Sequence, residues 1–315
     1  MIPSARRAAP LPLLPAALLL LAGCGGGGAL DLRFRPAPGT RFRSEMVVDQ
    51  RILAPVEGTE QAMDQTLGFE LTTEVLAPPP GGGHRARLTF DRTRMRMRNP
   101  AGEVAFDSAH PAEPIPAQFR GLAFMAGRSL ECSFAADGTV DRVSGMDALF
   151  DGMMEEMAVP AGERREVLAA GIKRQFGDGA MREMVGSLVT GFAGRPVRVG
   201  ESWEWRRRLQ AILPMTLDWT STLLSREGGR ARVALRGRVS PFEEAPPVDL
   251  GLARMRSSFT GTVEGEVEVE EATGFPASLR TVQEIAGTLT LEMDGVPPAV
   301  NPMRVSSTTT VKRLP

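Results

Sequence analysis

The sequence contains 315 residues and has a formal net charge of −1. A chain of this length can bury one large core or two small ones. The near-neutral charge argues against the basic surface that binds DNA or RNA, so we expect no nucleic-acid partner. Only Lys173 and Lys312 are lysines among the 37 basic residues. We attribute the excess of arginine to the codon usage of a GC-rich genome rather than to a phosphate site.

The N-terminus has the arrangement of a secretory signal peptide. Arg6 and Arg7 precede an apolar stretch over residues 8–21, which is the order of charged and apolar regions in such peptides. The stretch contains three prolines and is shorter than the ~18–20 residues that a membrane-spanning helix needs. We therefore expect residues 1–23 to be a signal peptide rather than a transmembrane anchor.

The tetrapeptide Leu21-Ala22-Gly23-Cys24 follows this stretch and resembles the lipobox of bacterial lipoproteins. The resemblance implies cleavage before Cys24, a diacylglyceryl group on its thiol and an acyl group such as palmitate on its new amine. Residues 24–30, which are rich in glycine, would form a short tether. We expect an exported chain that is lipid-anchored to the cell envelope. Gly25 after the cysteine favours the outer membrane where the source has two membranes. The alternative is a chance tetrapeptide in a leader that is cut elsewhere.

Cys132 is the only other cysteine, so the exported chain can form no internal disulfide. It alternates with Leu130 and Phe134, which places it on the apolar side of a predicted strand. We expect a buried, unreactive thiol. Dimerisation through Cys132 or nucleophilic chemistry is the alternative.

Most of the remaining sequence shows the period-2 alternation of half-buried strands. We predict about ten or eleven strands, each apolar on one side only, which favours an antiparallel sheet with one solvent-exposed face. A switch of parity at Asp91–Arg92 predicts a β-bulge, and Asp137-Gly138 predicts a hairpin turn. Two of the apolar rows are Phe42, Met46, Val48 and Ile52, and Met63, Leu67, Phe69 and Leu71.

Residues 145–193 have a helical period instead. Apolar residues at helical spacing predict a first helix that ends at Pro160, and two more helices over 167–176 and 181–192. We therefore predict an α+β fold, in which a curved, mainly antiparallel sheet surrounds a central three-helix segment. Residues 31–315 would form a single β-rich domain.

The sequence contains no recognisable catalytic or cofactor motif. His84 and His110 are the only histidines, and neither has a companion at metal-ligand spacing. We predict no enzyme activity, no cofactor and no metal. Hydrolysis by a pair of carboxylates needs no motif and is the remaining enzymatic alternative. One ladder of acids could bind calcium but is more typical of a solvated sheet face: Glu264, Glu266, Glu268 and Glu270.

The chain has 16 methionines, several of them on the predicted helices. Flexible thioether side chains suit surfaces that accept varied apolar ligands, although an ordinary packed helix face is the alternative. The candidate residues for binding an apolar ligand are Met146, Phe150, Met153, Met157, Met181, Met184 and Leu188.

Three segments, Leu32–Thr40, Asp137–Gly145 and Val197–Trp203, resemble an uncharacterised family of bacterial lipoproteins. The lipobox, the one-sided sheet and the amphipathic helices together resemble the lipoprotein-localisation (LolA/LolB-like) half-barrels. These resemblances imply a non-enzymatic envelope lipoprotein that binds an apolar ligand, such as lipid acyl chains, between sheet and helices. Its partners would be the membrane, through the N-terminal lipid, and that ligand. The alternatives are a structural lipoprotein that contacts another envelope protein, and an unrecognised hydrolase.

Overall fold

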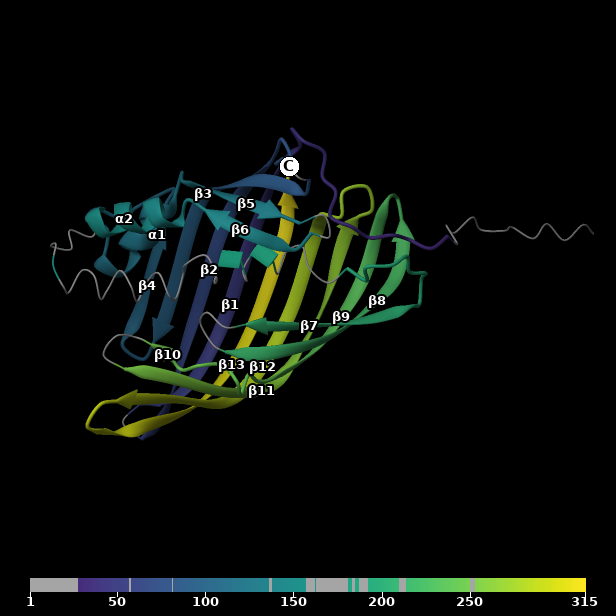
Figure 1. The fold of residues 1–315 in the computed structure, drawn as a ribbon. Coiled ribbons are helices and arrows are strands. Elements are labelled where there is room, and N and C mark those ends of the chain that lie inside the picture. Colours follow the sequence, from purple (N-terminus) through teal and green to yellow (C-terminus); the bar gives the residue numbers. More distant parts are fainter. Residues whose placement is uncertain are drawn as a thin grey trace, which may run out of the picture.

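The computed structural model describes residues 28–56, 58–80, 82–135, 138–156, 162, 181–182, 185–186, 192–209, 214–249 and 253–315. They form one 13-stranded sheet with the strand order β6-β5-β3-β2-β1-β13-β12-β11-β9-β8-β7 (Figure 1). The remaining two strands, β4 and β10, pair with β3 and β11. The strands are β1 (Arg41–Val56), β2 (Thr59–Leu76), β3 (His84–Asn99), β4 (Gly102–Asp107), β5 (Ser129–Phe134), β6 (Val140–Ser144), β7 (Ser202–Leu209), β8 (Met215–Glu227), β9 (Arg230–Pro241), β10 (Val248–Asp249), β11 (Arg254–Glu270), β12 (Pro276–Met293) and β13 (Val296–Leu314).

The predicted α+β fold with a three-helix segment is wrong. The described residues are nearly all strand, with a short 3-10 helix, η1 (Ala117–Phe119), and two α-helices, α1 (Arg120–Met125) and α2 (Met146–Glu156). Within 145–193 the described residues contain α2 and helical residues at 181–182 and 185–186, while the predicted helix over 167–176 and the rest of the predicted helix over 181–192, except residue 192, lie outside the described residues. Helical periodicity is a local signal that does not show how much of the core a segment supplies. Here the sheet itself supplies most of the core.

The sequence also underestimated the number of strands. β10, of 2 residues, is too brief to show alternation, and β4, of 6 residues, has Phe106 as its one buried side chain and so lacks a buried apolar row. The predicted bulge is confirmed, because Glu70 pairs with Arg92 and Leu71 with Phe90, which leaves Asp91 as the extra residue. The predicted hairpin is also present, since β5 pairs with β6 around Gly138, whose φ is +88°.

The first and last strands lie side by side and join the two halves of the sheet. β1 pairs with β13 from Arg43↔Leu314 to Leu53↔Arg304. On one face of this junction Lys312 Nζ lies 2.6 Å from Glu45 Oε2. Arg94 of β3 reaches the same carboxylate across β2. It can do so because the strand between them has Gly68 there, and a side chain would overlap Arg94.

The sheet curves toward the side that carries the helices (Figure 1). Its two end strands approach each other around Gly186, where a side chain would meet Arg207 Nη2 of β7 at 3.3 Å and Val140 Cγ2 of β6 at 3.8 Å. Bending is also visible at Gly261 of β11, where a side chain would overlap the backbone carbonyl of Glu284 on β12. We call the face that meets the helices the concave face and the other the convex face.

The N-terminal segment 30–34 fills one end of the curved sheet. Leu30 forms a β-bridge with Val197, and Leu32 is buried. The Phe34 ring lies 4.9 Å from that of Phe134, between ring centroids, and belongs to the main core cluster. Segment 30–34 therefore acts as part of the core at the end of the sheet where β1 begins and β13 ends.

Replacing Phe34 by alanine should destabilise the protein strongly. The side chain is 2% exposed, and removing a buried phenylalanine ring costs about 3–5 kcal/mol. We expect urea denaturation to show a loss of about 3 kcal/mol in the free energy of unfolding. Val104→Ala, at an exposed position, is the control and should change it by less than ~0.5 kcal/mol. Similar losses in both variants would contradict a core role for segment 30–34.

Cys132 lies in the core, as the sequence predicts. It is 1% exposed and pairs in register with Ala86 and Val143. Burial, with a smaller contribution from the nearby charge of Glu131, raises the pKa of its thiol to about 12. The thiol therefore stays protonated and shielded at neutral pH.

This environment predicts that Cys132 resists thiol reagents in the native protein. At pH 8 a reagent such as dithionitrobenzoate should label it only as fast as the protein unfolds, and at once in denaturant. Labelling is followed by absorbance. Rapid labelling of the folded protein would place Cys132 on the wrong face of β5.

Candidate functional site

The convex face carries charges that are paired across strands. Arg232 of β9 donates two hydrogen bonds, of 2.8 and 3.1 Å, to the carboxylate of Glu266 on β11. Arg230 Nη1 lies 2.9 Å from Glu268 Oε1. Glu266 and Glu268 of the glutamate ladder are therefore ion-paired, and no cluster of potential metal ligands occurs in the described part of the chain.

Two carboxyl groups on this face, those of Asp107 and Glu45, are held as anions by neighbouring cations. A hydrogen bond from Arg92 lowers the pKa of Asp107 to about 2, with Arg92 Nε 2.8 Å from Asp107 Oδ1. Lys312 is the main cause of the lowered pKa of Glu45. A general acid at neutral pH requires a raised pKa, whereas these carboxyls are held as anions in ion pairs.

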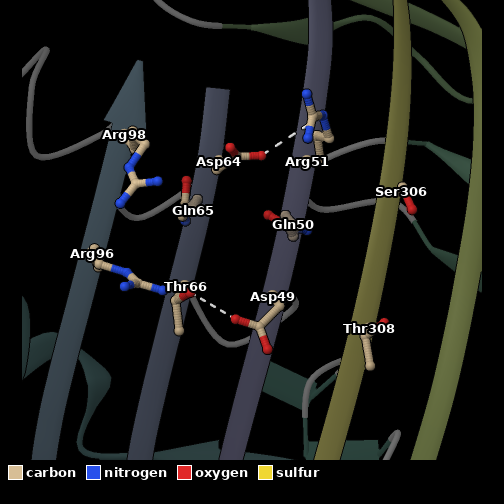
Figure 2. Close-up of a pocket in the computed structure, with 10 residues that line it drawn as sticks. All are labelled: Asp49, Gln50, Arg51, Asp64, Gln65, Thr66, Arg96, Arg98, Ser306 and Thr308. Carbon is tan, nitrogen blue, oxygen red and sulfur yellow. Dashed lines mark hydrogen bonds and ion pairs between the residues drawn. The ribbon is translucent and has the colours of Figure 1, made fainter. Parts of the chain in front are cut away.

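A polar groove of about 330 Å³ crosses the convex face of β3, β2, β1 and β13 (Figure 2). In it Thr66 Oγ1 donates a hydrogen bond of 2.6 Å to Asp49 Oδ1, and Arg51 Nε lies 3.9 Å from Asp64 Oδ1. Two further grooves, of about 350 and 450 Å³, lie beside the loop 241–247 and beside α1. The polar side chains that line this groove suit water and polar solutes.

The structure places the predicted ligand-binding residues mainly in the core. Met146 and Phe150 of α2 are 3% and 4% exposed, and Met181 is buried in the same cluster. Met153 is half-buried and packs against α1 at Gly121. Four other predicted residues lie outside the described part of the chain: Cys24, Met157, Met184 and Leu188.

A different set of apolar side chains, four of them methionines, lies on the concave face of adjacent strands. These side chains are half-buried rather than buried, and their strands β13, β1, β2 and β3 are consecutive in the sheet. Ile52 pairs with both Met63 and Val305, and Leu67 pairs with Met95. We call this set the methionine surface: Ile52, Met63, Leu67, Met95, Met97, Met303 and Val305.

Sequence reasoning identified several of these residues as strand positions but did not separate them from the buried core. Alternation shows which face a residue occupies, but not whether another element covers that face. The recurrence of methionine at alternate positions, as in Met95 and Met97, is the one signal that marked them. Methionine adapts its shape more readily than branched residues.

A row of uncharged polar side chains crosses the same face. Gln65 of β2 pairs with Gln50 of β1, Gln50 with Ser307 of β13, and Ser307 with Gln283 of β12. We call these four residues the glutamine row. Gln50 and Gln65 also border the groove of Figure 2. They alternate with Asp49 and its convex neighbours, so their side chains project to the concave face.

The same register continues to a pair of tryptophans. Gln283 pairs with Val263, Val263 with Gly237, and Gly237 with Trp219. The rings of Trp219 and Trp205 stack with centroids 5.3 Å apart and an interplanar angle of 9°. Trp205 Nε1 donates a hydrogen bond of 3.0 Å to Ser221 Oγ. Trp219 Nε1 is buried and has no hydrogen-bond partner among the residues that the structure describes.

Apolar side chains are exposed at the end of the sheet opposite segment 30–34. Val56 lies at the tip of the β1–β2 hairpin, and Met293, Val296 and Val300 lie at the tip of the β12–β13 hairpin. The register of β1 with β13 places both tips at one end. We call these four residues the apolar tips.

Comparison with known proteins places this fold in a family without assigning a chemistry to it. None of the helices that the structure describes is long and apolar enough to cross a membrane. No curated protein matches the chain. Residues 84–276, from the start of β3 to the first residue of β12, match a family described as a family of unknown function, DUF6263. The match covers more than half of the sequence, and the chain therefore belongs to the DUF6263 family.

Proposed function

We propose that this chain is a lipid-anchored protein of the cell envelope that binds an apolar ligand, such as lipid acyl chains, on the concave face of its sheet. The observation that carries the proposal is the methionine surface, whose apolar side chains remain half-buried inside the curve of the sheet. Partly exposed apolar side chains on a concave face favour ligand binding over simple packing. The likeness to bacterial lipoproteins and to LolA/LolB-like half-barrels supports the same proposal.

The proposed lipid anchor would lie close to the end of the sheet at which Gly28 is held. Its carbonyl oxygen accepts a hydrogen bond of 2.8 Å from Arg226 Nη1, at the end of β8. Only four residues, 24–27, separate Gly28 from the lipid, and they reach at most about 14 Å. A lipid on Cys24 would therefore hold this end of the sheet near the membrane and direct the apolar tips away from it.

This geometry also favours a second candidate function, contact with another envelope protein. Val296 and Val300 are 51% and 59% exposed, and exposed apolar side chains that cluster at one end of a molecule are typical of interaction sites. In this alternative the protein is a structural lipoprotein, and the apolar tips rather than the concave face carry its function.

Replacing Cys24 tests the anchor. Cys24→Ala should abolish acyl labelling of the protein and release it, uncut or soluble, from the membrane fraction, because the thiol that carries the lipid is lost. Labelling with a radioactive fatty acid and membrane fractionation measure both effects, with Gly26→Ala as the control that retains the lipid. Unchanged labelling and membrane retention in Cys24→Ala would contradict the lipoprotein assignment.

A charge on the methionine surface tests ligand binding. Met63→Glu should weaken binding of a fluorescent fatty-acid probe by at least about tenfold, because a carboxylate is costly to desolvate against an acyl chain. Ala62→Glu, on the convex side of the same strand, is the matched control and should bind normally. Thermal unfolding shows whether both variants are folded. Normal binding by Met63→Glu, or no binding by the wild type, would favour the second candidate function.

A further inference from the structure

The glutamine row interrupts a face that is otherwise suited to hydrocarbon. On one side of it lie Leu67, Val48 and the hydroxyls of Thr309 and Thr281, in one register row. On the other side lie the apolar residues Met63, Ile52, Val305 and Ile285, in the next row. A band of polar side chains therefore crosses the concave face, with an apolar row on one side and a row of two apolar and two hydroxyl side chains on the other.

The amides in this band have unused hydrogen-bonding capacity. Gln50, Gln65 and Gln283 are half-buried, and within the part of the chain that the structure describes their side chains make no hydrogen bond to protein. Each amide offers two N–H donors and one carbonyl acceptor. Because these side chains are only half-buried, their amides can hydrogen-bond to water or to the polar group of a ligand.

The band is also uncharged. In strands β2, β1, β13 and β12, the glutamine row and the rows on either side contain no acidic or basic side chain. An ionised carboxylate or phosphate placed there would lose its hydration without gaining a counter-charge, which is unfavourable. An ester or amide carbonyl and free hydroxyls would instead be matched by the donors and acceptors of the glutamines.

We infer that the glutamine row binds the uncharged ester or amide group of an acylated ligand, of the chemical class of an acylglycerol, while its acyl chain lies on the methionine surface. This inference rests on the proposed function and specifies its ligand. The unpartnered Trp219 Nε1, further along the same register, is another uncharged donor. Ligands with the same chain but an ionised headgroup are expected to bind more weakly.

The test compares ligands of equal chain length on the full chain carrying Cys24→Ala, so that no attached acyl group competes. A monoacylglycerol and the corresponding fatty acid, which is ionised at pH 8, each displace a fluorescent acyl probe. We expect the monoacylglycerol to bind at least about tenfold more tightly than the fatty acid. The glutamines can form two hydrogen bonds with the monoacylglycerol, whereas the charged carboxylate of the fatty acid must be desolvated. Equal binding, or tighter binding of the fatty acid, would overturn the inference but leave the proposed function standing.

Variants of the glutamine row give a second, independent readout. In Gln50→Leu/Gln65→Leu/Gln283→Leu, the preference for the monoacylglycerol should fall to within about twofold, because leucine keeps the volume and removes the amide. Gln61→Leu, on the concave side of β2 but outside the row, is the matched control and should keep the preference. If the triple variant does not fold, the single variant Gln65→Leu replaces it, and its preference for the monoacylglycerol is expected to fall about threefold. An unchanged preference in these variants would overturn the inference, and a wild type that binds no acyl probe would overturn both it and the proposed function.

Discussion

The pairing of β1 with β13 is the constraint on which the rest of the structure depends. It joins strands from opposite ends of the chain, so it closes the longest loop in the fold, and the entropy of that closure must be offset by the contacts formed. Met46 and Val311 are buried in register on the concave face. On the convex face the carboxylate of Glu45 binds both Lys312 and Arg94. Without this junction the halves β1–β6 and β7–β13 would each expose a further unpaired edge, at β1 and at β13, which promotes aggregation.

A single sheet with one apolar face must shield that face from water with other parts of the same chain. Here the curvature of the sheet shields part of the concave face, and segment 30–34, η1, α1 and α2 cover a further part. Phe119 of η1 stacks on Phe106 of β4, and Thr93 of β3 donates a hydrogen bond of 2.8 Å to the carbonyl of Leu122 in α1. These elements lie toward β3 and toward the N-terminal segment. The methionine surface lies in the middle of β13, β1, β2 and β3, where the concave side chains are half-buried.

Alternation along the sequence identified the strands and their faces, because side-chain direction in a strand is fixed by its two-residue period. It thereby located the bulge at Asp91 and the burial of Cys132 correctly. It could not give the strand order, since β1 meets β13 only through long-range pairing that leaves no local signal. The sequence could not show the glutamine row for the same reason, because Gln50 and Gln283 come to lie on either side of Ser307 only when β1, β13 and β12 are aligned. The helical segment was overestimated because its period describes one face of a helix and says nothing of how much sheet surrounds it.

Charge is separated between the two faces of the sheet, and this separation has a chemical consequence. On the convex face many arginines and carboxylates form ion pairs across strands, as in the bidentate pair of Arg232 with Glu266. On the concave face the central rows contain no charge that could select an ionised ligand. Selection there must come from shape and from neutral hydrogen bonds, which are strongest where water is partly excluded. A row of half-buried amides supplies such bonds at a fixed depth along the strands. A ligand recognised in this way would be held by its acyl chain on the methionine surface and positioned by its polar group. Its affinity and its position along the strands would then depend on different residues.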